Sequence, residues 1–214
     1  MAKPMSVSTA PLDPVTVGED RATVSHVEAR FNRFQNKNTF WRHTQNGTMA
    51  QFDRAFEDAI ARLRKELGQT HPLVIDGKEL KAKSTFTTKS PADHSIVVGK
   101  WAAGTKADAR KAIAAAKKGF PAWSARPWQE RVAIIEAAAD LFTDHFYDLC
   151  AVMSVEAGKS RYEASIDVDE AVDFLRFYAL TMREMGGFDM EMGHPVPSED
   201  CRSVRRPWGV FSVV

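Results

Sequence analysis

The sequence predicts an α/β fold in which helices dominate residues 50–187 and a central sheet begins only at the end of the chain. Apolar residues recur at helical spacing in several long segments. From Arg206 to Val214 the sequence reads as a turn followed by an apolar, β-branched run. Such a run is typical of a strand buried on both faces of a parallel sheet, which needs a crossover helix and a neighbouring strand. We therefore expect the front part of a longer α/β protein, truncated at its first central strand.

The composition is that of an ordinary globular protein of one or two domains. Hydrophobic residues make up 44% and charged residues 27% of the 214 residues, which excludes disordered and membrane classes. The net charge of +1 gives no general reason to expect nucleic acid or anionic lipid as partners. No apolar run approaches the about 20 residues of a spanning helix, and no secretory signal is visible. We expect a cytoplasmic protein whose cysteines, Cys150 and Cys201, lack metal or redox spacing.

Residues 1–49 are predicted to form a partly flexible N-terminal arm, because prolines interrupt a Ser- and Thr-rich start. The stretch 31–41 is basic and aromatic, without a clear period. Such a segment can bind single-stranded nucleic acid by stacking and phosphate contacts. Alternatively, its aromatic side chains dock on the protein's own surface, which is the reading we favour. The aromatic residues are Phe31, Phe34, Phe40 and Trp41.

Turn and cap signals divide the middle of the chain. A helix is expected from Phe52 to Leu67, with Gly68 just past its end. Asp76-Gly77 predicts a hairpin turn between two short strands, and a third strand is expected over 95–99. The later helices are predicted from their caps and periods. Thr105 with Asp108 begins one that ends near Gly119, the alanine-rich segment 132–139 forms the next, and a third runs over 144–157 to Gly158.

The best-defined helix begins at Ser160 and Glu163, which form a capping box, and runs to about Met185 before Gly186-Gly187. Residues 188–206 contain Pro195 and Pro197, which suit edge strands or an arm better than a central sheet. We therefore divide the chain into the arm 1–49, a helical and hairpin part 50–187, an oligomerisation arm 188–206, and the start of the central sheet, 207–214.

The sequence contains no complete set of catalytic, cofactor-binding or metal-binding residues. There is no Gly-rich phosphate loop, and Lys159 follows Gly158 without one. The six histidines are scattered, with no pair at i, i+4 on a helix, so we predict no metal site. By spacing alone, we assign no catalytic and no cofactor-binding residue.

The ordered series of segments nevertheless resembles the aldehyde dehydrogenase superfamily. The matching segments are Ser90-Pro91-Ala92-Asp93, residues 107–116 leading to Phe120 and Trp123, Arg131, Glu156-Ala157-Gly158-Lys159, Glu163-Ala164, and Arg206-Pro207-Trp208-Gly209-Val210. Within it, residues 52–77 and 164–174 are most similar to the 1-pyrroline-5-carboxylate dehydrogenases, also called L-glutamate γ-semialdehyde dehydrogenases. Ser90 stands where an Asn is usual, and residues 1 to about 40 match nothing in the group.

The resemblance implies the N-terminal part of a Rossmann-type, NAD-dependent enzyme that oxidises L-glutamate γ-semialdehyde to L-glutamate in proline degradation. A cysteine attacks the aldehyde, and hydride passes to NAD. The nucleophile and the NAD-binding residues would lie beyond Val214, so the chain alone would be catalytically incomplete. The alternative is a short, non-catalytic helical protein that binds or regulates such an enzyme.

The resemblance also implies one substrate-binding site. Ile166, Glu170 and Phe177 are at i, i+4 and i+11, so they share one helix face. In the family the corresponding face lines the aldehyde tunnel, and a carboxylate there suits a substrate with an α-amino group. The alternative is a solvated Glu170 on a helix that also carries Asp167, Asp169 and Asp173. The family further implies a homo-oligomer, joined through residues 188–206.

Overall fold

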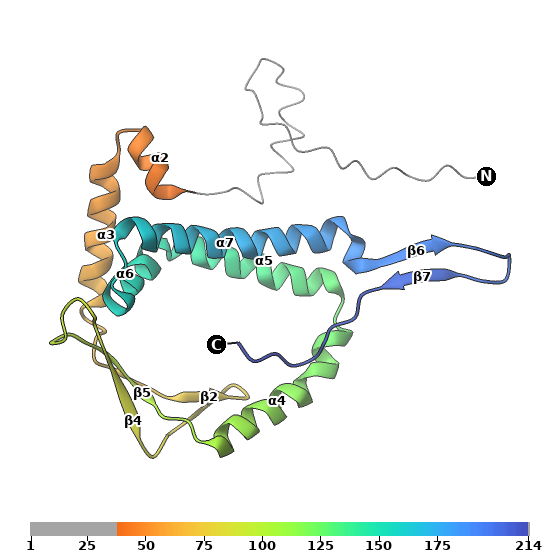
Figure 1. Cartoon of the computed structure of the whole chain (residues 1–214), viewed down its shortest axis with the longest axis horizontal. Helices are drawn as coiled ribbons and strands as arrows, with labels where there is room; N and C mark the ends of the chain where they lie inside the picture. Colours follow the sequence, from red (N-terminus) through yellow and green to blue (C-terminus); the bar gives the residue numbers. More distant parts are fainter. Residues whose placement is uncertain (1–37, 214) are drawn as a thin grey trace. The chain divides into compact units, whose positions relative to one another are not determined.

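The computed structural model describes residues 38–213, which contain both helices and strands, as expected for the α/β class (Figure 1). The helices are α2 (Thr39–Gln45), α3 (Met49–Leu63), α4 (Lys106–Ala125), α5 (Trp128–Asp144), α6 (Phe146–Ala157), α7 (Arg161–Glu184) and the 3-10 helix η1 (Gly186–Phe188). The strands are β1 (Thr70–His71), β2 (Leu73–Ile75), β3 (Lys78–Leu80), β4 (Thr85–Lys89), β5 (Val97–Ala102), β6 (Asp189–Gly193) and β7 (Cys201–Val204).

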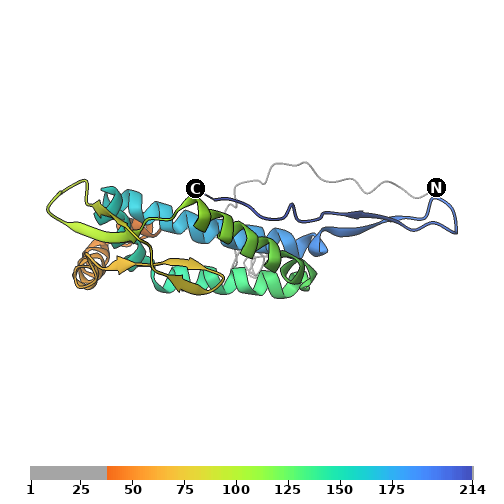
Figure 2. The same ribbon diagram turned by 90° about the horizontal axis from the view of Figure 1, so that it is seen from below.

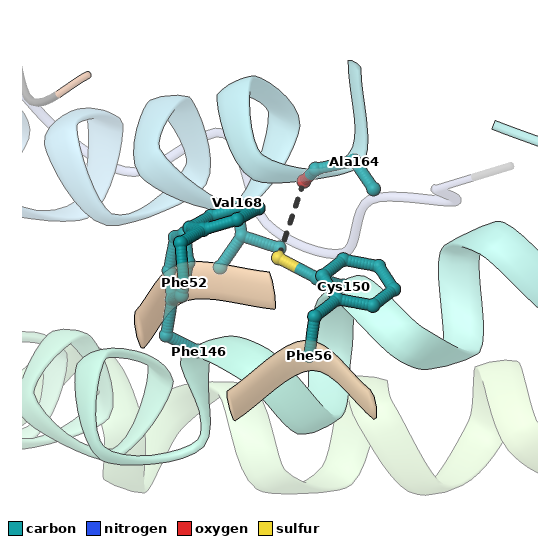
Figure 3. Packing of buried hydrophobic residues seen from close by; sticks show 6 residues of the cluster. All are labelled: Phe52, Phe56, Phe146, Cys150, Ala164 and Val168. Atoms are coloured by element: carbon teal, nitrogen blue, oxygen red, sulfur yellow. Dashed lines mark hydrogen bonds between the residues drawn. The ribbon is translucent and has the colours of Figure 1, made fainter. Parts of the chain in front are cut away.

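The main hydrophobic core lies where α3, α6 and α7 meet (Figure 3). Phe52 of α3 and Cys150 of α6 are completely buried. Small side chains let α6 and α7 approach closely, so that the Cys150 thiol donates a 3.6 Å hydrogen bond to the carbonyl of Ala164. Burial of this size is worth about 1.5–3 kcal/mol per large side chain, and it is what positions α7. The cluster consists of Phe52, Phe56, Phe146, Cys150, Ala164 and Val168.

Helix α5 packs along α7 (Figure 1). Arg183 of α7 pairs with Glu136, and Arg176 pairs with Asp140, one turn further along α5. The residue numbers of the paired side chains fall along α7 as they rise along α5, so the two helices are antiparallel.

Helix α2 lies inside the segment predicted as an arm, and it packs on the body. The ring of Phe40 meets Phe52 edge-on at 5.4 Å and Tyr162 of α7 at 5.1 Å. The docking alternative therefore holds for Phe40, while Phe31 and Phe34 lie outside the described residues. The sequence of α2 has no helical period of apolar residues, because this helix contributes no fully buried side chain.

The strands between α3 and α4 form two small sheets. β5 is central in a three-stranded sheet, parallel to β1 and antiparallel to β4, and β2 pairs with β3. The Asp76-Gly77 hairpin is confirmed, with φ of 54° and 69°. The strand expected over 95–99 is β5, which begins at Val97 and runs on to Ala102. β1 and β4 were not predicted, because β1 has two residues and β4 is polar and mostly exposed.

Both predicted capping boxes are present, at Thr105–Asp108 and at Ser160–Glu163. The predicted end of a helix near Gly119 is wrong, because α4 continues to Ala125 with Pro121 inside it. Gly119 is not among the glycines with positive φ, so it does not end the helix. Helix α3 also ends earlier than predicted, at Leu63.

The helix predicted over 144–157 is α6, and Gly158 ends it in the left-handed conformation with φ 70°. Gly68 also has a positive φ of 76°, but its N–H donates to the carbonyl of Val98, so it joins α3 to the sheet region. The alanine-rich segment 132–139 lies within the longer α5.

Strands β6 and β7 pair antiparallel as a two-stranded ribbon (Figure 2). Pro195 and Pro197 lie in the connection between the strands, not within them. The strand predicted at the end of the chain is not formed in the described residues 207–213, where Trp208 is 94% exposed. A strand requires a neighbouring strand for its hydrogen bonds, and the described residues pair none with it. The division of the chain into four regions stays a prediction.

Candidate functional site

The three predicted substrate-binding residues lie together on the outer face of α7. Glu170 is exposed, Phe177 is 43% exposed, and Ile166 is half-buried. The opposite face of the helix is covered through Val168 and Val172, which are almost completely buried. The packing of α7 on the core thus turns the predicted face outward.

Two further aromatic side chains, Phe174 and Tyr178, lie beside this face. Phe174 and Tyr178 are 50% and 63% exposed, and their rings stack at 6.2 Å. Phe177 meets Tyr178 edge-on at 5.5 Å. The spacing puts the ring of Phe174 one turn, and those of Phe177 and Tyr178 about two turns, from Glu170, but periodicity alone does not tell which face is covered. A carboxylate beside exposed rings can hold a cationic group by charge and by cation–π contact.

The rotation of α7 is fixed from its buried side. Asp169 is 3% exposed, and its carboxylate accepts hydrogen bonds from the backbone N–H of Thr39 at 2.6 Å and from the Thr39 hydroxyl at 2.9 Å. Since successive helical residues are about 100° apart, an inward Asp169 places Glu170 toward the outside. At the start of the helix, the Ser160 hydrogen bonds hold the pKa of Glu163 below its usual range. Lys159 pairs with Asp167 across the first turns.

Cys150 does not have the surroundings of a nucleophile. Burial, and secondly the charge of Asp169, raise the pKa of the Cys150 thiol to about 12, so the reactive thiolate is strongly disfavoured. Cys201 is exposed on β7. Among residues 38–213, no group of three or more His, Cys, Asp or Glu side chains is placed to hold a metal ion. In the same range no helix is long and apolar enough to cross a membrane.

The N-termini of α4 and α7 are poorly suited to bind the phosphates of a dinucleotide. Each of these two N-termini is closed by a capping box, in which Asp108 or Glu163 accepts a hydrogen bond from the N–H of the N-cap residue. Each box also places a carboxylate where a phosphate would bind. We therefore assign no NAD contact to these residues.

Sequence and fold together define the class of protein. The profile described as "Aldehyde dehydrogenase family" matches residues 79–214, more than half of the chain. The chain belongs to the aldehyde dehydrogenase family.

Within the family, the chain is similar to named enzymes. It is 36% identical over 164 residues to the 1-pyrroline-5-carboxylate dehydrogenase of Bacillus pumilus, covering 75% of this chain and 31% of the relative. A crystal structure of 1-pyrroline-5-carboxylate dehydrogenase from Thermus with bound NAD matches with a TM-score of 0.61 and 35% identity, over 68% of this chain and 28% of that one. The crystal structure of proline utilization A from Bdellovibrio bacteriovorus matches with a TM-score of 0.70 and 29% identity, over 74% of this chain and 16% of that one. The chain thus spans about a third or less of each relative.

Proposed function

We propose that this chain is the N-terminal part of an NAD-dependent dehydrogenase that oxidises L-glutamate γ-semialdehyde, formed from 1-pyrroline-5-carboxylate, to L-glutamate in proline degradation. The observation that carries the proposal is the 36% identity, over three quarters of the chain, to a 1-pyrroline-5-carboxylate dehydrogenase. The cysteine nucleophile and the NAD site would come from residues outside these 214. The chain alone would be inactive, and the whole enzyme would work in the cytoplasm.

The outer face of α7 would bind the part of the substrate that is remote from the aldehyde. The carboxylate of Glu170 would pair with the α-ammonium group, while Ile166 and Phe177 would contact the carbon chain. Two observations support these roles. The side chains share one face, and that face is turned away from the core by Val168, Val172 and the Asp169–Thr39 hydrogen bonds. A charge-assisted contact of this kind gives specificity for a substrate with an amino group.

Glu170→Gln in a full-length enzyme tests this role, because it keeps the shape of the side chain and removes its charge. Loss of a hydrogen bond to a charged group costs about 1–3 kcal/mol, which lowers kcat/KM for glutamate semialdehyde roughly 5- to 150-fold. An aldehyde of similar length without the amino group is the control, and it should lose much less. Equal losses for both aldehydes would assign Glu170 to the fold, and no loss for either would return it to the solvated face.

The proposal includes a homo-oligomer joined through residues 188–206. The β6–β7 ribbon supports this role, because a sheet of two strands is marginal in water and its outer edges have unpaired backbone groups. Its side chains are exposed, Met192 by 65%. In a full-length enzyme, deletion of residues 190–200 should lower the oligomer mass measured by light scattering. An unchanged mass would exclude this ribbon as the joint between subunits.

A further inference from the structure

The corner between α2 and α3 is an exposed left-handed turn. Asn46 ends α2, with its N–H donating to the carbonyl of Arg42 at 3.0 Å. Gly47 follows with φ +66°, and a Cβ built there would meet nothing within 4 Å. Thr48 closes the turn, since its N–H donates to the carbonyl of His43 at 2.9 Å. Both Asn46 and Gly47 are exposed to water.

This dipeptide combines an electrophile and a nucleophile that can close a five-membered ring. The electrophile is the side-chain amide carbon of Asn46, and the nucleophile is the backbone nitrogen of Gly47. Glycine has no Cβ to shield that nitrogen or to restrict the rotation that ring closure needs. Within residues 38–213, the side-chain amide of Asn46 makes no hydrogen bond that would hold it away from the backbone.

Asn38, at the other end of the same helix, is a matched comparison. Its side-chain oxygen accepts a hydrogen bond from the N–H of Trp41 at 2.8 Å. The nitrogen that would attack it belongs to Thr39, and that N–H donates to the buried carboxylate of Asp169 at 2.6 Å. Thr39 is also β-branched. At Asn38 both reacting groups are held by short hydrogen bonds, whereas at Asn46 the side chain has no partner among the described residues and the Gly47 N–H donates only a longer, exposed bond of 3.3 Å to the carbonyl of Thr44.

We propose that Asn46-Gly47 is a site of spontaneous deamidation and isomerisation, and that Asn38 is protected from it. The Gly47 nitrogen loses its proton and bonds to the side-chain carbon of Asn46, and the amide nitrogen leaves as ammonia. One water then opens the resulting succinimide at either carbonyl, giving aspartate or isoaspartate. The net change is the gain of one water and the loss of one ammonia, with no oxidant or reductant. Because the Gly47 N–H must lose a proton, the rate rises with pH.

The modification would act on the contact between α2 and α3. Isoaspartate adds one methylene to the main chain between the helices, which separates the Thr48 N–H from the His43 carbonyl. Aspartate instead places a negative charge at the C-terminal end of α2, where the helix dipole is also negative. Since α2 buries no side chain completely, its last turn has little packing to resist either change. Its first turn would stay anchored by Asp169.

Trypsin separates the two asparagines, because it cleaves after Lys37, Arg42 and Arg54. The full chain is aged in mildly alkaline buffer, digested, and analysed by mass spectrometry. We expect the peptide 43–54 to convert to two isomeric products of the deamidated mass while the peptide 38–42 stays unchanged. Gly47→Ala should slow the conversion about tenfold, equivalent to about 1.4 kcal/mol in the barrier. Asn46→Gln should stop it, since its ring closure is less favourable.

A synthetic peptide with the sequence of residues 43–54 is the unfolded control and should convert at least as fast as the folded chain. Conversion of this peptide without any in the folded chain would show that the corner protects Asn46, which would overturn the proposal. Conversion of Asn38 at the same rate as Asn46 would overturn the assignment of protection to the Trp41 and Asp169 hydrogen bonds. Hydrogen exchange of the aged chain reports the consequence: amides of α2 near Asn46 should exchange faster than those near Thr39.

Discussion

Large apolar side chains occur both in the helical body, formed by α2, α3, α5, α6 and α7, and in the C-terminal segment, residues 189–213. Only the body buries some of them completely. Phe52 and Cys150 are completely buried in the body. In the C-terminal segment Trp208 is 94% and Phe211 71% exposed, and every residue except Gly209 is exposed. The apolar side chains of the two regions are of the same kinds. Their different burial therefore depends on the neighbouring helices and strands that the described residues supply.

This contrast explains why similar local signals have different outcomes in the two regions. A helix with an apolar stripe gains most of its stability by packing that stripe on another element, and α3, α6 and α7 do this for one another. A two-stranded ribbon needs a third strand or a covering helix for the same purpose. The C-terminal segment therefore has the pattern of a buried region without its cover, as expected for a chain that spans about a third of its relatives.

The two cysteines test this contrast with the largest expected effect, because one lies in each region. Cys201 should react with a thiol reagent at once, whereas Cys150 should react more slowly by a factor on the order of a thousand or more, since it must wait for the body to open. The measurement is labelling followed by mass spectrometry at neutral pH. Comparable rates at both thiols would show that the body is not packed as described.

The raised pKa of Cys150 adds a pH dependence. The neutral thiol is the form that the body stabilises, so this contribution is complete below the ordinary pKa of 9.0. It is lost as pH rises from there toward about 12. Cys150→Ala should remove this loss of stability at high pH. Denaturant unfolding at several alkaline pH values measures the difference.

The joint between the two regions gives a second, smaller effect. Gly187 has φ +79°, and an added Cβ would lie 2.6 Å from Nε1 and 2.7 Å from Cγ of Trp128 at the start of α5. Gly186 has φ +55°, but a Cβ there would meet nothing within 4 Å. Both alanine variants bear the left-handed strain of about 1–2 kcal/mol. Gly187→Ala adds a clash worth about 1–3 kcal/mol. Urea unfolding of the two variants isolates that clash, and equal losses would mean that the indole moves aside freely.

Local chemistry made part of this fold predictable. The capping boxes at Thr105 and Ser160, the turn at Asp76-Gly77 and the stop at Gly158 each depend on residues a few positions apart, so the sequence contains the whole signal. The end of α4 was missed because Gly119 and Pro121 are usually breakers, and only their surroundings decide whether they end a helix.

The candidate site, too, was predictable only in part from the sequence. That Ile166, Glu170 and Phe177 share a face follows from their spacing, and the structure agrees on the face. Which face is covered depends on contacts between distant residues, above all the bond from Thr39 to Asp169, 130 residues apart. No local pattern contains that information, so the exposure of Phe174 and Tyr178 could not be predicted.

The smallest expected effect comes from comparing one Arg–carboxylate pair in each region. In the body, Arg183 donates two hydrogen bonds to the two oxygens of Glu136, at 2.9 and 2.5 Å, and both side chains are about two-thirds buried or more. In the ribbon, Arg202 donates one hydrogen bond of 3.0 Å from Nε to an oxygen of Asp189, forms an ion pair of 2.9 Å with the same oxygen, and is more exposed.

Arg183→Met should lower the free energy of unfolding by about 1–2 kcal/mol, because it removes two hydrogen bonds to a partly covered carboxylate. Arg202→Met should change it by less than about 0.5 kcal/mol, as is usual for exposed pairs. Adding Glu136→Gln to Arg183→Met should recover part of the loss, since the carboxylate charge that Arg183 balanced is then removed. Urea unfolding measures all three variants. If Arg202→Met proved as costly as Arg183→Met, the ribbon would have to be covered in solution, and the contrast between body and segment would fail.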